Sequence, residues 1–177
     1  MKKFAILLTL FIVAVAFAAP VAAGNAERPF KGSFSGVVLG FDPVIGDRCP
    51  NTPPGKFPVF VASFEGWGTA THLGNSYIFG EHCSYGTVDA GGPDGTYGQG
   101  ILILIAANGD VLEGTYDDGM GLSGPPVIGF IDRFTFVDGG TGRFTFASGG
   151  GLESGFVDVT DFSFSIKMKG VINYSRR

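Results

Sequence analysis

The chain has 177 residues, a net charge of −4 and an apolar fraction of 45%, with 30 glycines and 18 phenylalanines. An acidic chain without a run of Lys or Arg argues against nucleic acid or anionic lipid as a partner. The abundance of large apolar side chains, which alternate with glycine, excludes an intrinsically disordered chain.

The first 23 residues predict a secretory signal peptide. Lys2 and Lys3 supply a positive start, and residues 4–18 form an apolar stretch too short for an ordinary transmembrane helix. The small residues that a signal peptidase requires follow at Val21, Ala22 and Ala23. We therefore expect one domain over residues 24–177, with a net charge of −6 once Lys2 and Lys3 are removed, in a secreted or periplasmic location.

The first half of the mature chain predicts strands. Residues 30–41 and 57–68 are strand-like, and residues 69–85 form either one long bent strand or two short ones. On residues 57–68, Glu65 shares a face with Trp67 because strand side chains alternate with a period of two. Both are candidate ligand-binding residues if that face lines a lumen; the alternative puts Glu65 at the rim.

Cys49 and Cys83 are the only two cysteines. In an exported chain such a pair predicts a disulfide, which would tie a proline-rich loop to a later strand. The alternative is a zinc site that adds His72 and His82, but the spacing contains neither a C-x-x-C nor an H-x-x-x-H pair. We therefore expect the disulfide, and neither a resident metal nor a cofactor.

Two further strand segments, residues 98–107 and 110–117, flank Asn108 and Gly109. Asn-Gly predicts a type I′ hairpin turn, in which both central residues have positive φ. Within the first segment, Ile101 to Ile105 are apolar on both faces. A bare apolar strip on a sheet promotes aggregation, so we expect a second layer or a subunit interface over it.

Residues 127–137 predict another strand, and one face of it is apolar apart from Asp132. The apolar members of that face are Ile128, Phe130, Phe134 and Phe136, and the three phenylalanines are candidate ligand-binding residues. A regular strand would place Asp132 inside, where burial raises the pKa and makes the carboxyl a proton donor or a polar handle for a ligand. The alternatives are a bulge that turns Asp132 outward and a pairing with Arg133 or Arg143.

Few other residues predict chemistry. His72 is a second candidate catalytic residue, either as a general base or as an ordinary strand histidine bonded to backbone. The sequence contains no G-x-S-x-G, no H-E-x-x-H and no phosphate loop, and its Asp-Gly loops lack the spacing of an EF-hand. No enzyme class is therefore indicated by a motif.

Residues 162–174 give the clearest strand. Phe162, Phe164, Ile166 and Met168 alternate with serine and lysine, which indicates one buried and one solvated face. No segment shows a sustained helical period, although residues 141–148 have room for a single turn. About eight strands in a glycine-rich chain of this length predict a closed antiparallel barrel, with a β-sandwich as the alternative.

Three segments carry a family resemblance. Gly139–Phe144 (GGTGRF), followed by Ala147 and Gly149, resembles the G-G-T-G-x-F-x-x-A-x-G signature shared by plant dirigent proteins and, in looser form, allene oxide cyclases. The segments 71–74 and 107–112 resemble parts of small exported bacterial proteins of that barrel superfamily. The resemblance implies an eight-stranded barrel with a hydrophobic lumen, commonly a trimer, which steers a substrate without a cofactor. None of the catalytic side chains of these families matches a position here.

Three functions fit these observations. The first is an exported barrel that binds a small hydrophobic molecule in its lumen. The second is a cofactor-free cyclase, isomerase or dirigent-like coupling guide that uses Asp132 or His72. The third is a structural or surface-interaction protein with a filled core. A membrane-embedded barrel is not expected, because Trp67 is the only tryptophan and such barrels carry aromatic girdles at both interfaces.

Overall fold

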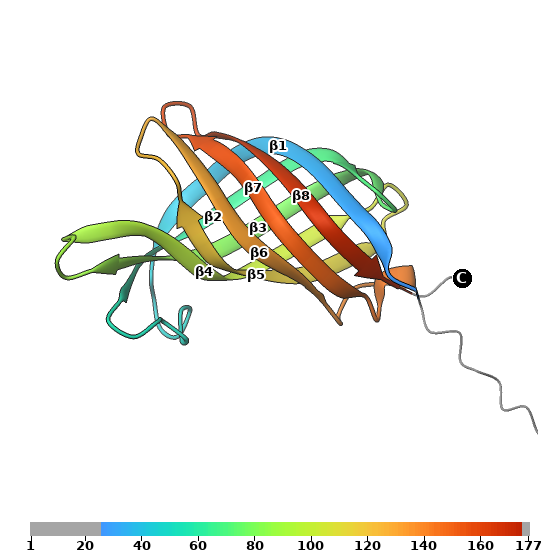
Figure 1. Cartoon of the computed structure of the whole chain (residues 1–177), viewed down its shortest axis with the longest axis horizontal. Helices are drawn as coiled ribbons and strands as arrows, with labels where there is room; N and C mark the ends of the chain where they lie inside the picture. The colour runs from blue at the N-terminus through green and yellow to red at the C-terminus, as the bar shows by residue number, and fades with distance from the viewer. Residues whose placement is uncertain (1–25, 175–177) are drawn as a thin grey trace, which may run out of the picture.

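The computed structural model describes residues 26–174, which form one closed antiparallel barrel of eight strands (Figure 1). The strands are β1 (Arg28–Pro43), β2 (Phe57–Ala70), β3 (Gly74–Thr87), β4 (Gly92–Ile105), β5 (Val111–Gly121), β6 (Val127–Val137), β7 (Ser148–Asp158) and β8 (Ser163–Asn173). Each strand pairs with its neighbour in sequence, and β8 pairs with β1 to close the barrel. The predicted all-β barrel is confirmed and the sandwich alternative is wrong. The predicted signal peptide lies outside the described residues.

Two strand predictions differ from the structure. Residues 69–85 divide at a turn around His72, and β3 begins at Gly74. β7 was not predicted, because its sequence, SGGGLESGFVD, has too few large side chains to mark a period of two. β7 nevertheless pairs along its length with β6 on one side and β8 on the other.

One end of the barrel is filled, and we call it the closed end. The rings of Phe30, Phe134 and Phe136 pack there with centroids 4.9 to 5.9 Å apart. The 3₁₀ helix η1 (Gly142–Phe144) adds the fully buried Phe144 to this core. Figure 1 shows η1, in orange, beside the C-terminal end of β8.

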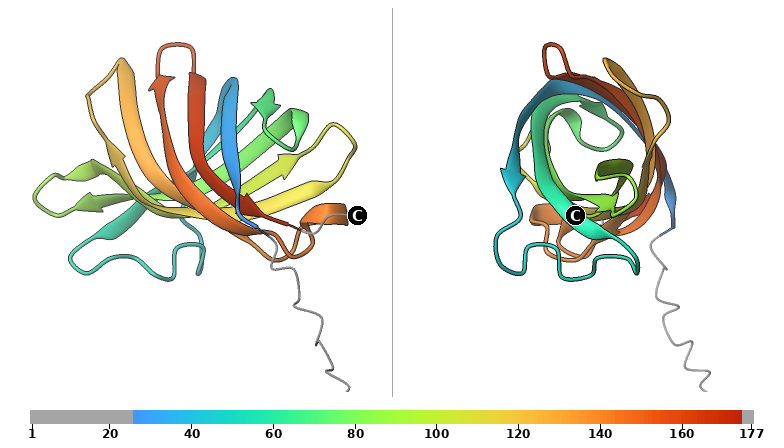
Figure 2. Two further views of the ribbon diagram at one scale, coloured as in Figure 1. Left: turned by 45° about the vertical axis from the view of Figure 1, so that its right-hand side comes forward. Right: turned by 90° about the vertical axis from the view of Figure 1, so that its left-hand side faces the viewer.

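The opposite end, which we call the open end, carries the connections β1–β2, β3–β4, β5–β6 and β7–β8. The right panel of Figure 2 looks toward this end and shows the ring of strands. The Cys49–Cys83 disulfide, with a Cα–Cα distance of 6.0 Å, ties the β1–β2 connection to β3. Cys83 packs with Val61 and Tyr85 in a small cluster separate from the main core. The predicted disulfide is confirmed, and the zinc alternative falls because both sulfurs are bonded to each other.

The hairpin between β4 and β5 is present, but its predicted turn type is wrong. Gly109 has φ of +84°, whereas Asn108 is not among the non-glycine residues with positive φ in the described chain. The Gly109 amide donates to the Ala106 carbonyl, and the Ala106 amide donates to the Asp110 carbonyl. A type I′ turn needs positive φ at both central positions, so this turn belongs to another class.

The segment predicted to be apolar on both faces lies on β4, and its side chains alternate between the inside and the outside of the barrel. Leu102 and Leu104 are buried inside the barrel, while Ile101 and Ile105 are 44% and 37% exposed on its outer wall. Within residues 26–174 no second sheet or packed helix covers this wall. Of the two predicted covers, a second layer is not supplied by residues 26–174. No helix of the described part is long and apolar enough to cross a membrane.

Candidate functional site

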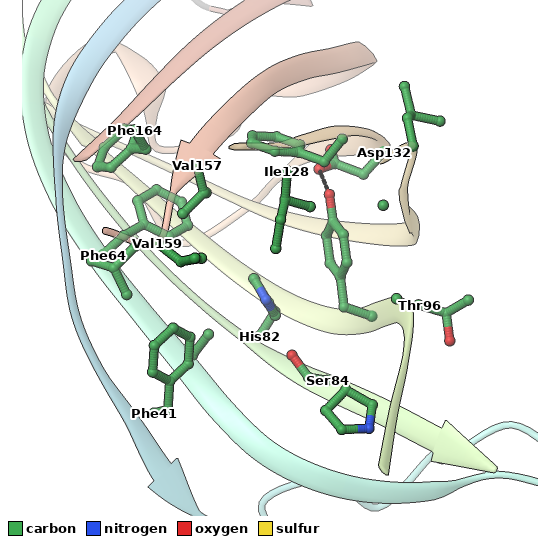
Figure 3. A pocket seen from close by; sticks show the side chains of 18 of the residues that line it. Phe41, Phe64, His82, Ser84, Thr96, Ile128, Asp132, Val157, Val159 and Phe164 are labelled. Carbon is green, nitrogen blue, oxygen red and sulfur yellow. Dashed lines mark hydrogen bonds between the residues drawn. The ribbon is translucent and has the colours of Figure 1, made fainter. Parts of the chain in front are cut away.

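The interior at the open end is a cavity of about 790 Å³ (Figure 3). Its wall is largely aromatic and aliphatic, with Phe41, Phe64, Ile128, Phe130, Val157 and Phe164 among its members. Residues at the start of β4 (93–96), in the β5–β6 connection (122–125) and in the β7–β8 connection (Val159) also line it, so it opens at this end of the barrel. The barrel is thus filled with side chains at one end and hollow at the other.

Besides Ser84, Asp94 and Thr96, which also line the cavity, five consecutive strands each place one ionisable side chain in a group whose members lie next to one another. They are His82 on β3, Tyr97 on β4, Tyr116 on β5, Asp132 on β6 and Glu153 on β7. We call these five residues the polar cluster. From β1, β2 and β8 the cavity receives only side chains that do not ionise, among them Phe41, Phe64 and Phe164.

Hydrogen bonds join the polar cluster into two pairs. The Tyr97 hydroxyl donates to Asp132 Oδ2 at 2.7 Å, the dashed line of Figure 3. The Tyr116 hydroxyl lies 2.9 Å from His82 Nδ1, and the His82 ring lies on the Tyr97 ring with centroids 4.4 Å apart. Both phenol groups are therefore already engaged inside the cluster.

The two carboxyl groups are direct neighbours in the sheet. Asp132 on β6 is the cross-strand partner of Glu153 on β7, and each is only 2% exposed. Cross-strand partners bring their side chains close on the same face. Asp132 Oδ1 and Glu153 Oε2 are buried without a hydrogen-bond partner, although buried polar atoms are rarely left unpaired.

Burial sets the protonation states of this cluster. It raises the pKa of Asp132 to about 7, against the opposing effect of the Tyr97 hydrogen bond. Burial also raises the pKa of Glu153 well above its ordinary value, and the nearby Asp132 carboxylate adds to the effect. Desolvation lowers the pKa of His82 to about 4, so the imidazole is neutral at neutral pH. Near pH 7 the two carboxyls therefore hold at least one proton between them.

A β-bulge in β4 is what turns Tyr97 inward. The register of β4 against β3 shifts by one residue between the pairs Glu81–Ile101 and Cys83–Gly98, and Gln99 has φ of +52°. Tyr97 is separated from Ile101 by an even number of positions. On a regular strand its side chain would therefore point to the outer face, as that of Ile101 does. The Gly-Gln-Gly sequence at residues 98–100 is the local signal of the bulge.

Glycines on neighbouring strands seat the two tyrosine rings. Gly119 on β5 is the cross-strand partner of Tyr97, and Gly100 on β4 is the partner of Tyr116. A Cβ atom at either glycine would collide with the ring of its partner. Each tyrosine ring thus lies over the glycine of the neighbouring strand, where no side chain occupies the space. This packing fixes the position of the hydroxyl group.

The predicted site residues on β6 lie inside the barrel, as the period of two indicated. Asp132 and Phe130 line the cavity, and Asp132 forms no ion pair with an arginine. Phe134 and Phe136 lie deeper, in the packed core of the closed end. The alternative of an outward-turned Asp132 is therefore wrong, and the two deeper phenylalanines do not line the cavity.

Glu65 and Trp67 do not line the lumen, which corrects the expectation for β2. Trp67 is 68% exposed and its ring packs on Tyr77, whose hydroxyl donates to Glu65 at 2.6 Å on the outer wall. The inward side chains of β2 are instead those of Phe60 and Phe64. Large apolar residues occupy both faces of β2, so alternation alone does not tell the inner face from the outer one.

His72 lies away from the cavity, which removes it as a general base there. It occupies the β2–β3 turn with φ of +72°. Its Nε2 lies 3.1 Å from the Pro29 carbonyl, and its ring packs on Tyr174. Of the two alternatives for His72, the structure supports the histidine that is hydrogen-bonded to the backbone.

Sequence reasoning missed four members of the polar cluster. Glu153 lies on the strand that was not predicted, and Tyr97 depends on the bulge. His82 follows Ile78 and Gly80 on the inner face of β3, and Tyr116 follows Leu112 and Gly114 on β5, so period-two alternation could have found both.

The polar cluster can hold a proton near neutral pH at the base of an apolar cavity. Such a group can bind the polar end of a ligand or transfer a proton to it. No protein-family model, no curated protein and no solved structure matches this chain. Its function is therefore inferred from the geometry and chemistry of the cavity.

Proposed function

We propose that this protein binds one small, largely apolar molecule in the open half of its barrel. The cavity of about 790 Å³, walled by aromatic and aliphatic side chains, is the observation that carries the proposal. Barrels of eight strands commonly hold a single small ligand, and ligand pockets span roughly 300 to 1,000 Å³. A structural or surface-interaction protein is expected to have a filled core. The cavity therefore favours ligand binding over that alternative.

The proposal includes export. A disulfide such as Cys49–Cys83 persists in oxidising compartments, and residues 1–23 have the composition of a signal peptide. The ligand is accordingly a molecule encountered outside the cytoplasm.

Native mass spectrometry of the exported protein, purified from its host without detergent, tests for this ligand. We expect a bound molecule of a few hundred daltons that organic solvent extracts. If the exported protein repeatedly carries nothing and also takes up no apolar compound in vitro, binding is the wrong function.

A second function, cofactor-free isomerisation or cyclisation, is favoured by the Asp132–Glu153 pair. A carboxyl with a pKa of about 7 can both accept and donate a proton at neutral pH. In that case the extracted molecule should change on incubation with fresh protein, and Asp132→Asn should slow the change while the molecule still binds. A molecule that stays chemically identical with the unaltered protein would contradict catalysis.

The proposal also covers assembly. The outer wall of β4 carries Ile101, Ile103 and Ile105, and we propose that a second copy of the chain covers it. Exposed apolar strips on a sheet commonly mark such interfaces.

A further inference from the structure

The floor of the cavity has more hydrogen-bond acceptors than donors. Asp132 Oδ1 and Glu153 Oε2 are buried without partners, while the two phenol hydroxyls are engaged with Asp132 and His82. Among the described residues no Lys or Arg lines the cavity. Lys56 is paired with Asp94, a lining residue, at 3.3 Å.

We propose that the ligand carries a cationic amine, and that this amine enters first and donates hydrogen bonds to Asp132 and Glu153. The inference rests on the proposed function and names the chemistry of the bound molecule. An ammonium group offers up to three donors and a positive charge, which match two carboxyl oxygens that lack donors. The apolar wall above the floor contacts the remainder of the molecule.

Other head groups fit the floor less well. A ligand carboxylate would be repelled by the carboxylate that the pair retains. It would also lose its hydration in a cavity that has no cation to pair with it. A carbonyl can accept one proton from a protonated carboxyl, but it leaves the other buried acceptor unpaired. An alcohol donates a single hydrogen bond and carries no charge.

Binding of an amine should also expel protons from the floor. A cation beside Asp132 and Glu153 favours their ionised forms, so the protons that burial retains there leave for solvent. The other ionisable side chains that line the cavity are His82, Tyr97 and Tyr116, each neutral at pH 7.5, and Asp94, which is paired with Lys56 at the rim. Proton release on binding is therefore a specific signature of the cationic head.

Isothermal titration calorimetry of the mature, disulfide-bonded protein tests the inference. The probes are decan-1-amine, decan-1-ol and decanoate, which share one alkyl chain, at pH 7.5 in two buffers of different ionisation enthalpy. We expect the amine to bind at least about tenfold more tightly than the alcohol, as charge-assisted hydrogen bonds allow, and decanoate to bind most weakly. The heat of amine binding should depend on the buffer in the sense of proton release, whereas the heat of alcohol binding should not depend on the buffer.

The variant Asp132→Asn combined with Glu153→Gln should bind the amine no more tightly than the alcohol, without proton release. Glu65→Gln is the matched control, because Glu65 lies on the outer wall, and it should keep the preference for the amine. If the double variant does not fold, the amine-to-alcohol ratio and the proton release of the unaltered protein decide the matter.

Two results would overturn the inference in distinguishable ways. Equal or tighter binding of the alcohol or decanoate would reject the amine and leave an apolar ligand in place. Failure of all three probes, together with failure to bind a neutral apolar dye, would reject the binding function itself.

Discussion

Asp132 and Glu153 become a site because a closed barrel brings them together away from water. Among residues 26–174 no cation pairs with either carboxyl, and only one of their four oxygens receives a hydrogen bond from a side chain. The cost of charging such a pair is high, which is why burial raises both pKa values. Residues that lower stability in this way are commonly those that serve a ligand.

The raised pKa of Asp132 predicts a pH-dependent gain in stability for Asp132→Asn. Between the unfolded pKa near 4 and the folded pKa of about 7, the folded state binds more protons, so its stability falls as pH rises through this window. The asparagine side chain of the variant does not titrate, so the variant does not lose this stability. Its amide oxygen can still accept the hydrogen bond from the Tyr97 hydroxyl. We expect its Tm to exceed that of the unaltered protein at pH 8.5 and the gain to shrink toward pH 4.

Comparison of the two proteins at each pH cancels the contribution of His82. The lowered pKa of that residue acts in the opposite sense, because stability is lost as pH falls from about 6.5 toward 4. Asp138→Asn, at an exposed turn, is the matched control and should show no such trend. A difference in Tm that stays constant from pH 4 to 8.5 would contradict the assignment.

At the scale of strands, the cross-strand glycines connect the fold to the site. Gly119→Ala should lower the free energy of unfolding by about 1–3 kcal/mol, because the new methyl group displaces the Tyr97 ring. It should also break the Tyr97–Asp132 hydrogen bond and thereby raise the pKa of Asp132 further. Chemical denaturation and NMR titration of Asp132 measure the two effects.

Gly92→Ala is the control for this substitution. A Cβ at Gly92 meets no atom within 4 Å, and its φ is not in the left-handed region. Equal stability losses for the two variants would show that Gly119 does not act through the Tyr97 ring.

The disulfide constrains the connection between β1 and β2. It joins residues 34 apart in sequence, and a closed loop of that size stabilises a domain by about 3–4 kcal/mol in the chain-entropy model. The double variant Cys49→Ser, Cys83→Ser should lose about that much, measured by urea unfolding without reductant. Unaltered protein with reductant should behave like the variant, and a loss below about 1 kcal/mol in both would contradict the prediction.

Sequence alternation identifies the inner face of a strand where only one face is apolar, as on β6 and β8. Prediction fails where that rule does not apply. On β2 both faces carry large apolar residues, so Trp67 was assigned to the wrong side. On β7 glycine replaces the marker side chains, which concealed Glu153, and on β4 a bulge reverses the alternation and concealed Tyr97. Two of the five members of the polar cluster were thus concealed by irregular strands.

At the scale of the whole molecule, the outer wall of β4 predicts self-association. Ile103→Lys should convert an oligomer into a monomer, because a charge would be buried at the proposed contact. Light scattering after size-exclusion chromatography measures the mass, with Thr135→Lys on the outer wall of β6 as the control. An unaltered protein that is monomeric at high concentration would contradict the proposed interface.

The division of the barrel into a filled half and a hollow half is the central claim. Ser84 lines the cavity, so Ser84→Phe would fill part of it, whereas Ser35→Phe adds the same ring to the outer wall of β1. Fluorescence titration with Nile red, a neutral apolar dye, tests this directly. We predict saturable binding at one site per chain, weakened at least about tenfold by Ser84→Phe and unchanged by Ser35→Phe. Equal binding by both variants, or no binding by the unaltered protein, would contradict a ligand cavity at the open end.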